Sequence, residues 1–258
     1  TAQPHEVVPY PVGLRRGNHA TREAWMASAR FSTELLASTI GRPRLESAHV
    51  LDVGCGTKIV KALLDDDWPV ARYVGIDVAS EVIDWLRTHV DDPRFSFAHM
   101  NALNDLYNPD GVPLGQIGDL PAGDEPFDVI CLFSVFTHLA PEDFVTMLRL
   151  LRPHLRPEGK LVFSLFLTDP NGGWEDLIER SLRSDDPDVA RRARDAITAA
   201  MTEDTPGFVD EVPETPLLRA RYDRWYALAL VEESAGWSVD EIGPPNEHIQ
   251  NHMICSPR

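Results

Sequence analysis

One stretch of the chain, His49 to Thr57, constrains the fold more than any other. It reads HVLDVGCGT: an apolar run that ends in an acid, followed by two glycines that alternate with small residues, before a helical pattern begins. This order is typical of a buried parallel strand that enters a tight turn. Because Gly54 and Gly56 lack Cβ atoms, the turn can bend sharply and a ligand can lie against bare backbone. The following helix offers unpaired N–H groups, and open α/β sheets bind ligands at the carboxyl ends of their strands, so we expect a cofactor here.

The rest of the chain alternates between strand and helix patterns. Strands are predicted at about 48–53, 72–77, 94–99, 127–133, 160–167, 237–242 and 248–255. Helices are predicted at 21–40, 57–67, near 141 and over 217–234, and one more follows the second strand, with Val82, Ile83, Leu86 and Val90 on one face. Pro157-Glu158-Gly159 is predicted as the turn that precedes the fifth strand. This alternation predicts an α/β, Rossmann-like sheet of seven strands, mostly parallel with a terminal antiparallel β-hairpin, and helices on both faces. We expect a single domain over residues 1–258, with an N-terminal arm and helix at 1–43 and a lid-like insertion at 168–216.

Composition narrows the class of partner and the compartment. The formal net charge of −17 disfavours nucleic acid and anionic membranes, because both select basic surfaces. The sequence contains no run of 18 apolar residues, so no membrane-spanning helix is expected. The first 16 residues show no secretory signal. The three cysteines form no C-x-x-C pair and favour a reducing compartment, so we expect a cytoplasmic protein. A homo-oligomer remains compatible with the sequence.

The residues of the glycine turn distinguish a dinucleotide from a cofactor without phosphates. A dinucleotide-binding turn needs G-x-G-x-x-G and an acid about 20 residues later. Asp77 meets the second requirement, but Ile59 stands where the third glycine is needed. Asp52 would also place negative charge near phosphates. A cationic, phosphate-free ligand such as S-adenosylmethionine fits these residues better.

Four motifs in order resemble those of the class I S-adenosylmethionine-dependent methyltransferases. They are LDVGCG at 51–56, YVGIDV at 73–78, FDVI at 127–130 followed by SVFTHL, and LRPEGKLVF at 155–163. The resemblance covers roughly residues 45–167 and 217–258. Within this family, the chain is similar to the small-molecule and sugar O-methyltransferases of actinobacteria, among them those that act on methylmannose oligosaccharide precursors.

The resemblance implies a set of cofactor-binding residues: Asp52, Gly54, Gly56, Asp77, Val78, Asn101, Ala102 and Phe133. Asp77 stands where the family holds the ribose hydroxyls, and Asn101 stands where an acid commonly lies near the adenine. Lys58 occupies the place of the family's third glycine, so its side chain must point away or meet the methionine carboxylate. Other roles compete with these: Asp77 could serve as a helix N-terminal charge, Asn101 as a turn residue and Asp52 as a strand-end cap.

The residues that bind and deprotonate the methyl acceptor are predicted from side chains that follow the later strands. An alcohol must lose its proton during methyl transfer, and His138, just past the fourth strand, is the candidate general base. Its competing role is that of a helix-capping or half-buried histidine after Thr137. Asp169, Tyr222, Trp225 and Tyr226 are the candidate substrate-binding residues, although aromatics at helical spacing also pack in cores. Asp169 could help to hold Mg²⁺ or could form a simple Asp-Pro turn, and the metal ligands are unknown.

The sequence therefore predicts an S-adenosylmethionine-dependent O-methyltransferase. Its acceptor is expected to be a hydroxyl of a small molecule, with a sugar, oligosaccharide or mannoside precursor as the favoured class. Two alternatives remain open. One is a nicotinamide-dependent oxidoreductase on a Rossmann fold, and the other is an S-adenosylmethionine-binding module without catalysis.

Overall fold

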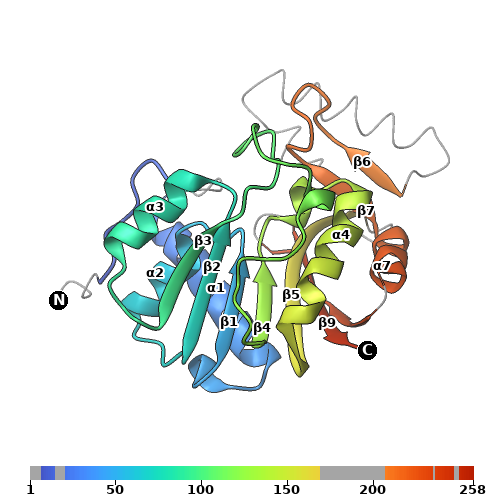
Figure 1. Ribbon diagram of the computed structural model, residues 1–258. Coiled ribbons are helices and arrows are strands. Elements are labelled where there is room, and N and C mark those ends of the chain that lie inside the picture. The colour runs from blue at the N-terminus through green and yellow to red at the C-terminus, as the bar shows by residue number, and fades with distance from the viewer. Residues whose placement is uncertain (1–6, 15–20, 169–206, 235, 247–249) are drawn as a thin grey trace. The chain divides into compact units, whose positions relative to one another are not determined.

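The computed structural model describes residues 7–14, 21–168, 207–234, 236–246 and 250–258 (Figure 1). The chain forms two compact units, which are considered one at a time. The first comprises Thr1–Phe133, Leu150–Val162 and Pro257, and the second comprises Ser134–Arg149, Phe163–Ser256 and Arg258. No helix within the described ranges has the length and apolar character needed to cross a membrane.

A parallel sheet forms the centre of the first unit. Its strands are β1 (His49–Val53), β2 (Arg72–Asp77), β3 (Phe95–His99) and β4 (Phe127–Leu132), in the order β3-β2-β1-β4, with the start of β5 (Leu155–Thr168) beside β4 (Figure 1). Strand β1 is parallel to both β2 and β4, and Val50 lies opposite Tyr73 and Val129. The residues of β4 are all buried, as expected for the near-continuous apolar run of a parallel strand.

Three helices belong to the first unit: α1 (Arg22–Thr39), α2 (Lys58–Asp65) and α3 (Ser80–His89), with short 3₁₀ turns at η1 (Pro43–Leu45), η2 (Leu114–Gln116) and η4 (Arg152–His154). The Thr21 hydroxyl accepts a hydrogen bond from the Ala24 amide and so caps the start of α1. Trp25, Ala29 and Leu36 recur at helical spacing and are buried. Helix α1 packs against α2, which begins directly after the glycine turn.

The segment 7–14 is anchored on α2 by a buried lysine. The Lys61 ammonium donates to the Val8 carbonyl and to Asp65, and Asp65 accepts in turn from the amides of Val7 and Val8. Lys61 is 0% exposed, so its charge is compensated inside the protein. The predicted N-terminal arm is therefore a packed part of the first unit over these residues.

The second unit contains η3 (Phe136–His138), most of α4 (Pro141–Leu151), the end of β5, β6 (Phe208–Asp210), β7 (Ala220–Asp223), α7 (Arg224–Glu233), β8 (Trp237–Ile242) and β9 (Asn251–Pro257). Strand β7 runs parallel to β5 and antiparallel to β6, while β9 pairs with β5 and β8. Phe136, Phe144 and Phe163 pack together with ring centroids 4.3–5.9 Å apart and form an aromatic core.

The predicted α/β fold with a mostly parallel sheet is confirmed, but three details were wrong. Nine strands pair within the described residues rather than seven, because the short β6 and β7 lie outside the regular alternation. The predicted helix 217–234 begins only at Arg224, since β7 precedes it. The predicted turn at 157–159 lies inside β5. Most of the predicted insertion, 169–206, lies outside the described residues, and the single-domain organisation stays a prediction.

Candidate functional site

The glycine turn follows β1 and is fixed by the end of β2. The amides of Gly54 and Cys55 both donate to the Ile76 carbonyl, at 2.7 and 3.0 Å. Gly54 and Gly56 have φ values of 73° and 49°, in the left-handed region that glycine tolerates best. A Cβ placed on Gly56 would meet no atom within 4 Å. The turn is therefore held from one side and open beside Gly56, as the approach of a ligand to bare backbone requires.

Asp77 connects this turn to the start of α3. Its Oδ2 accepts from the Gly56 amide at 2.8 Å, and its Oδ1 accepts from the Ala79 amide at 2.9 Å. The residue is 9% exposed. Two of the roughly four acceptor positions of this carboxylate are thus filled by backbone amides. The bond from Ala79 corresponds to the competing role at the start of a helix, and the predicted ribose role stays a prediction.

Asp52 lies beneath the turn, inside the core. It is 1% exposed, and its Oδ2 accepts from the Tyr73 hydroxyl at 2.6 Å. Burial raises the pKa of Asp52 from 3.8 to about 6, against the opposing effect of hydrogen bonds from Tyr73 and Cys131. The side chain therefore supports β1 from within the sheet.

Lys58, which replaces the family's third glycine, turns toward α1. Its ammonium donates to the Ser28 hydroxyl at 3.1 Å. The cation consequently ties the start of α2 to α1. Its charge also acts to lower the pKa of Asp52 beneath the turn, which burial raises.

The remaining predicted cofactor residues follow β2, β3 and β4. Val78 is half-buried, and its carbonyl contacts the His99 ring at 3.0 Å. Asn101 is exposed, and its Oδ1 accepts from the Asn108 side chain at 3.0 Å, whereas Ala102 is buried. Phe133 is half-buried directly after β4. The first unit thus holds all eight predicted cofactor residues, although Asn101 already shares its oxygen with Asn108.

His138, the predicted base, lies in η3 of the second unit. Its Nδ1 donates to the Leu217 carbonyl at 2.9 Å, so in the neutral ring the lone pair lies on Nε2. Burial lowers the pKa of His138 and the Arg219 guanidinium lowers it further, while hydrogen bonds to the backbone of Leu217 and Leu218 oppose the shift. The net effect favours a neutral imidazole of defined tautomer.

The predicted substrate-binding residues have different surroundings. Tyr222 is fully buried, donates to the Leu139 carbonyl at 2.5 Å and packs against Phe144 and Phe208. These contacts correspond to the core-packing role. Tyr226 is half-buried in α7. Asp169 and the Trp225 side chain lie outside the described residues.

A cluster of three charged residues at β6 and β7 was missed by the sequence analysis. Glu211 forms an ion pair with the buried guanidinium of Arg221 and lies 3.5 Å from Arg219. Burial raises the pKa of Glu211 and lowers that of Arg221 to about 10. Arg219 and Arg221 are two residues apart, the spacing of one strand face, but the apolar residues around them also fit a helix. In the described part of the chain, no group of three or more His, Cys, Asp or Glu side chains could hold a metal ion.

Comparison with known proteins is consistent with this site. A family model described as a methyltransferase domain matches residues 24–225. The trans-aconitate 2-methyltransferase of Azoarcus sp. is 31% identical over 136 residues, which are 53% of this chain and 45% of that protein. The fatty-acid O-methyltransferase of Mycolicibacterium smegmatis is 28% identical over 135 residues, covering 52% and 43%. The matches thus span less than half the length of these curated relatives.

Solved structures share the fold at low sequence identity. The magnesium protoporphyrin IX methyltransferase of Synechocystis PCC 6803, with bound SAH, has a TM-score of 0.54 and 12% identity, over 95% of this chain and 90% of that one. A Burkholderia thailandensis N1-methyltransferase with bound S-adenosylhomocysteine has a TM-score of 0.53 and 16% identity, over 92% and 81%. The narrower likeness to mannoside methyltransferases stays a prediction. The family match and the shared fold show that the chain belongs to the class I S-adenosylmethionine-dependent methyltransferases.

Proposed function

We propose that the protein is a cytoplasmic S-adenosylmethionine-dependent O-methyltransferase. Its acceptor is a hydroxyl of a small molecule, and a sugar or oligosaccharide, including a mannoside precursor, is the favoured class from the sequence resemblance. The observation that carries this proposal is the environment of His138: a half-buried ring whose pKa is lowered by burial and whose Nδ1 is held by a backbone carbonyl. The buried state of the three cysteines supports the reducing compartment.

The residues around the glycine turn fit the cofactor. When bound, S-adenosylmethionine supplies a methyl group on a sulfonium, which is open to attack by a nucleophile. The open backbone at Gly56 accommodates the cofactor, and the Asp77 carboxylate beside it binds ribose hydroxyls. Asp52 acts as a positioning residue that keeps β1 in place under the turn. The Lys58 ammonium donates to Ser28 of α1 and so helps to fix the start of α2 beside the turn.

His138 performs the proton chemistry in this proposal. The Nε2 lone pair takes the proton of the acceptor hydroxyl while the Nδ1–H group stays on the Leu217 carbonyl. A positioned general base of this kind contributes about 10²–10⁴ to the rate. The lowered pKa keeps the base form populated at neutral pH.

A second acceptor class is favoured by the charges at β6 and β7. Arg219 lies close enough to His138 to lower its pKa, and two arginines face the single carboxylate of Glu211. This surplus of positive charge suits a carboxylate acceptor, which needs no base because it is already ionised. The relatives named for trans-aconitate and fatty acid point in the same direction.

One assay separates these candidates. Mannosides, trans-aconitate and a fatty acid are incubated with S-adenosylmethionine, and products are detected by the mass of one added methyl group, with and without EDTA. For a hydroxyl acceptor, His138→Gln should lower kcat by about 10²-fold or more with unchanged cofactor affinity, whereas the exposed-histidine control His89→Gln should not. For a carboxylate acceptor, His138→Gln should retain kcat and Arg219→Gln should raise KM.

The same assay tests the predicted Mg²⁺. Turnover that is lost in EDTA and restored by added Mg²⁺ would support it.

Cofactor binding is measured separately by calorimetry. The Asp77→Asn variant exchanges one carboxylate oxygen for an amide donor, so it should weaken S-adenosylmethionine binding by about tenfold. Asp84→Asn, an exposed site on α3 whose side chain is 77% exposed, is the matched control. Absence of binding to the wild-type protein would contradict the proposed function. Binding without turnover on any acceptor would favour the non-catalytic module, and saturable NADH binding instead would favour the oxidoreductase.

A further inference from the structure

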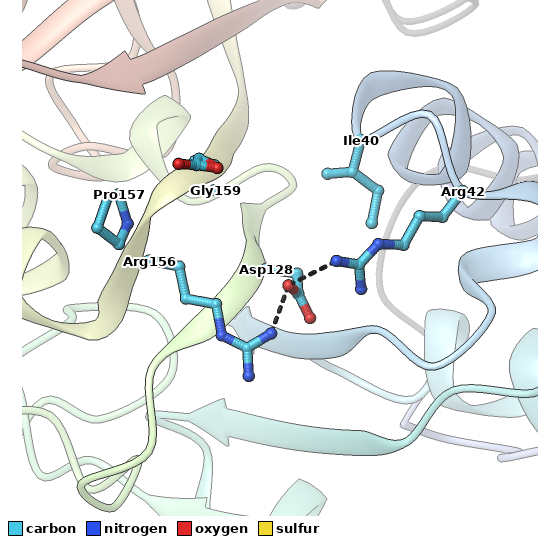
Figure 2. A pocket seen from close by; sticks show the side chains of 7 residues that line it. Ile40, Arg42, Asp128, Arg156, Pro157 and Gly159 are labelled. Carbon is cyan, nitrogen blue, oxygen red and sulfur yellow. Dashed lines mark hydrogen bonds and ion pairs between the residues drawn. The ribbon is translucent and has the colours of Figure 1, made fainter.

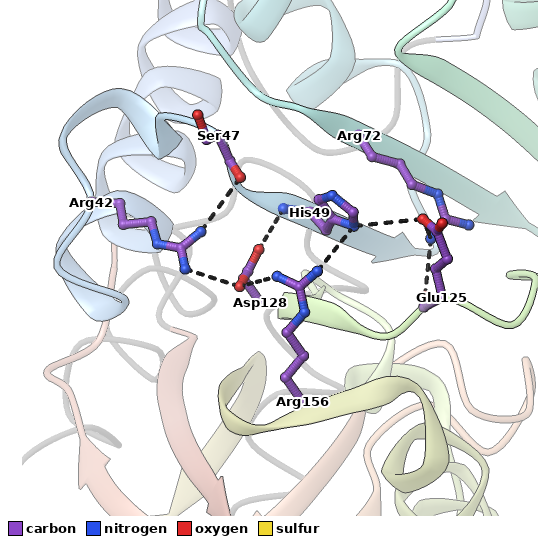
Figure 3. Close-up of polar contacts among 7 residues, drawn as sticks. All are labelled: Arg42, Ser47, His49, Arg72, Glu125, Asp128 and Arg156. Carbon is purple, nitrogen blue, oxygen red and sulfur yellow. Dashed lines mark hydrogen bonds and ion pairs between the residues drawn. The ribbon is translucent and has the colours of Figure 1, made fainter.

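A buried carboxylate gathers two arginines at the amino-terminal ends of β1 and β4. Asp128 Oδ1 accepts from Arg42 Nη2 at 3.1 Å and from Arg156 Nη1, while Oδ2 accepts from the His49 amide at 2.7 Å (Figure 3). Burial acts to raise the pKa of Asp128, but the His49 amide and the two guanidinium groups outweigh burial and lower it. Asp128 is therefore an anion that holds two cations close together.

The arginines keep hydrogen-bonding capacity beyond Asp128. Arg42 Nη1 reaches the Ser47 carbonyl only at 3.5 Å, and Arg156 Nη2 reaches His49 Nδ1 only at 3.4 Å (Figure 3). Within the described ranges, neither Nε–H group has a hydrogen-bond partner. The trio of Arg42, Arg156 and Asp128 carries one net positive charge in a chain whose net charge is −17. Unused donors and surplus positive charge are features of an anion site.

A cavity lies beside these two arginines. Its volume is about 340 Å³, and its lining consists of Ile40, Arg42, Asp128, Arg156, Pro157, Glu158 and Gly159. Figure 2 shows Arg42 and Arg156 reaching Asp128 from opposite sides, one from the segment after α1 and the other from β5. Small-molecule sites have volumes from about 300 Å³ upward. The apolar atoms of Ile40 and Pro157 provide surface for an organic group that accompanies the anion.

This cavity is separate from the glycine turn. It lies where β1 and β4 begin, whereas the turn follows the last residue of β1. The five residues of β1 at roughly 3.3 Å each put about 16 Å of strand between the two places. A ligand in the cavity therefore does not compete with a ligand at Gly56.

We propose that Arg42 and Arg156 form a second binding site, for an organic oxyanion of metabolite size, either a carboxylate or a phosphate monoester. The planar forks of two arginines match the paired oxygens of both groups. Asp128 is a positioning residue that fixes the distance between the forks. Glu158 is exposed at the cavity and forms no ion pair with either arginine among the described residues, so its charge opposes anion binding.

The test uses calorimetry on the full chain with benzoate and phenyl phosphate as probes, and benzamide as the neutral counterpart. At least one anion should bind saturably, and benzamide should not. Arg42→Gln and Arg156→Gln should each weaken binding by about tenfold, because each loses charge-assisted hydrogen bonds while Asp128 keeps the other arginine. Glu158→Gln should tighten binding by about two- to threefold. The two probes distinguish a carboxylate ligand from a phosphate monoester.

A matched control and a location readout complete the experiment. Arg30→Gln removes another arginine that pairs with a carboxylate, Asp66, outside the cavity, and should leave binding unchanged. Amide NMR shifts on probe addition should move at His49 and Gly159 and not at Gly56. The proposal is overturned if neither anion saturates at concentrations on the order of 10 mM, if Arg42→Gln and Arg156→Gln bind as the wild type does, or if only Gly56 responds.

Discussion

At the residue scale, Asp52 near the end of β1 faces the core rather than solvent. Its carboxylate is buried under the glycine turn and is satisfied by the Tyr73 hydroxyl. The sequence placed an acid at the end of a strand, which is compatible with both a ligand contact and a core contact. Only the direction of the side chain separates the two roles.

Asp52 makes stability depend on pH. Its folded-state pKa of about 6 lies above the unfolded value of 3.8, so the folded protein binds more protons between these values. Stability should therefore fall as pH rises from about 4 to about 6, and ionised Asp52 costs about 3 kcal/mol above that window. We expect the free energy of unfolding of Asp52→Asn, relative to wild type, to increase by about 3 kcal/mol between pH 4 and 7 in urea titrations.

The control for this titration is Asp91→Asn, an exposed aspartate after α3. This variant also removes one carboxylate, but from the surface, so it separates the effect of burial at Asp52 from the effect of losing one charge. A difference between Asp52→Asn and wild type that does not change with pH would show that the Asp52 carboxylate is not destabilised by burial.

At the element scale, α2 links the glycine turn to segments that precede it in the chain. Lys58 at its start donates to Ser28 in α1, and Lys61 one turn later holds the segment 7–14. The helix that follows the glycine turn is therefore braced by the N-terminal part of the first unit. Sequence periodicity predicted α2 but not these contacts, because lysines on a helix are equally compatible with a face exposed to solvent.

Removal of the Lys61 charge should release the segment 7–14. Lys61→Met leaves Asp65, whose side chain is 11% exposed, without its cation, and breaking a buried pair costs about 3 kcal/mol. We expect that loss in the free energy of unfolding, together with faster hydrogen exchange at Val7 and Val8. The control Arg30→Gln breaks the ion pair with Asp66, in which the arginine side chain is 50% exposed, and should cost less than about 1 kcal/mol. Unchanged exchange in Lys61→Met would contradict the anchoring role.

At the scale of the whole molecule, the three cysteines test whether each unit has a closed core. Cys55, Cys131 and Cys255 are free and buried, and burial raises the pKa of the Cys55 and Cys131 thiols well above their usual range. An inaccessible thiol with a raised pKa is a poor nucleophile. Ellman's reagent should therefore react with no thiol in the native protein and with all 3 after unfolding. Rapid reaction of any one in the native state would show that its unit opens.

Much of the fold could be predicted because its signals are local. The strand that ends in Asp52-Val53, the two glycines and the acid at Asp77 lie within 30 residues, and the alternation of apolar runs with helical spacing repeats down the chain. Residues 217–223 were harder, because Leu218 and Tyr222 fit a helix period although Ala220–Asp223 forms β7. Pairing with β5 and β6 decided that stretch, and such pairing is non-local.

The sequence by itself determined the family, the glycine turn after the first strand and the position of His138 after the fourth strand, since each follows from residues close together in the chain. The tertiary structure decided what those residues contact. Arg42 and Asp128 are 86 residues apart, and Asp128 and Arg156 are 28 apart, yet they meet where parallel strands begin. It also determined the environment of His138, because burial lowers its pKa and the Leu217 carbonyl fixes the tautomer of its neutral ring. Contacts and desolvation depend on the packing of distant segments, which no local pattern encodes.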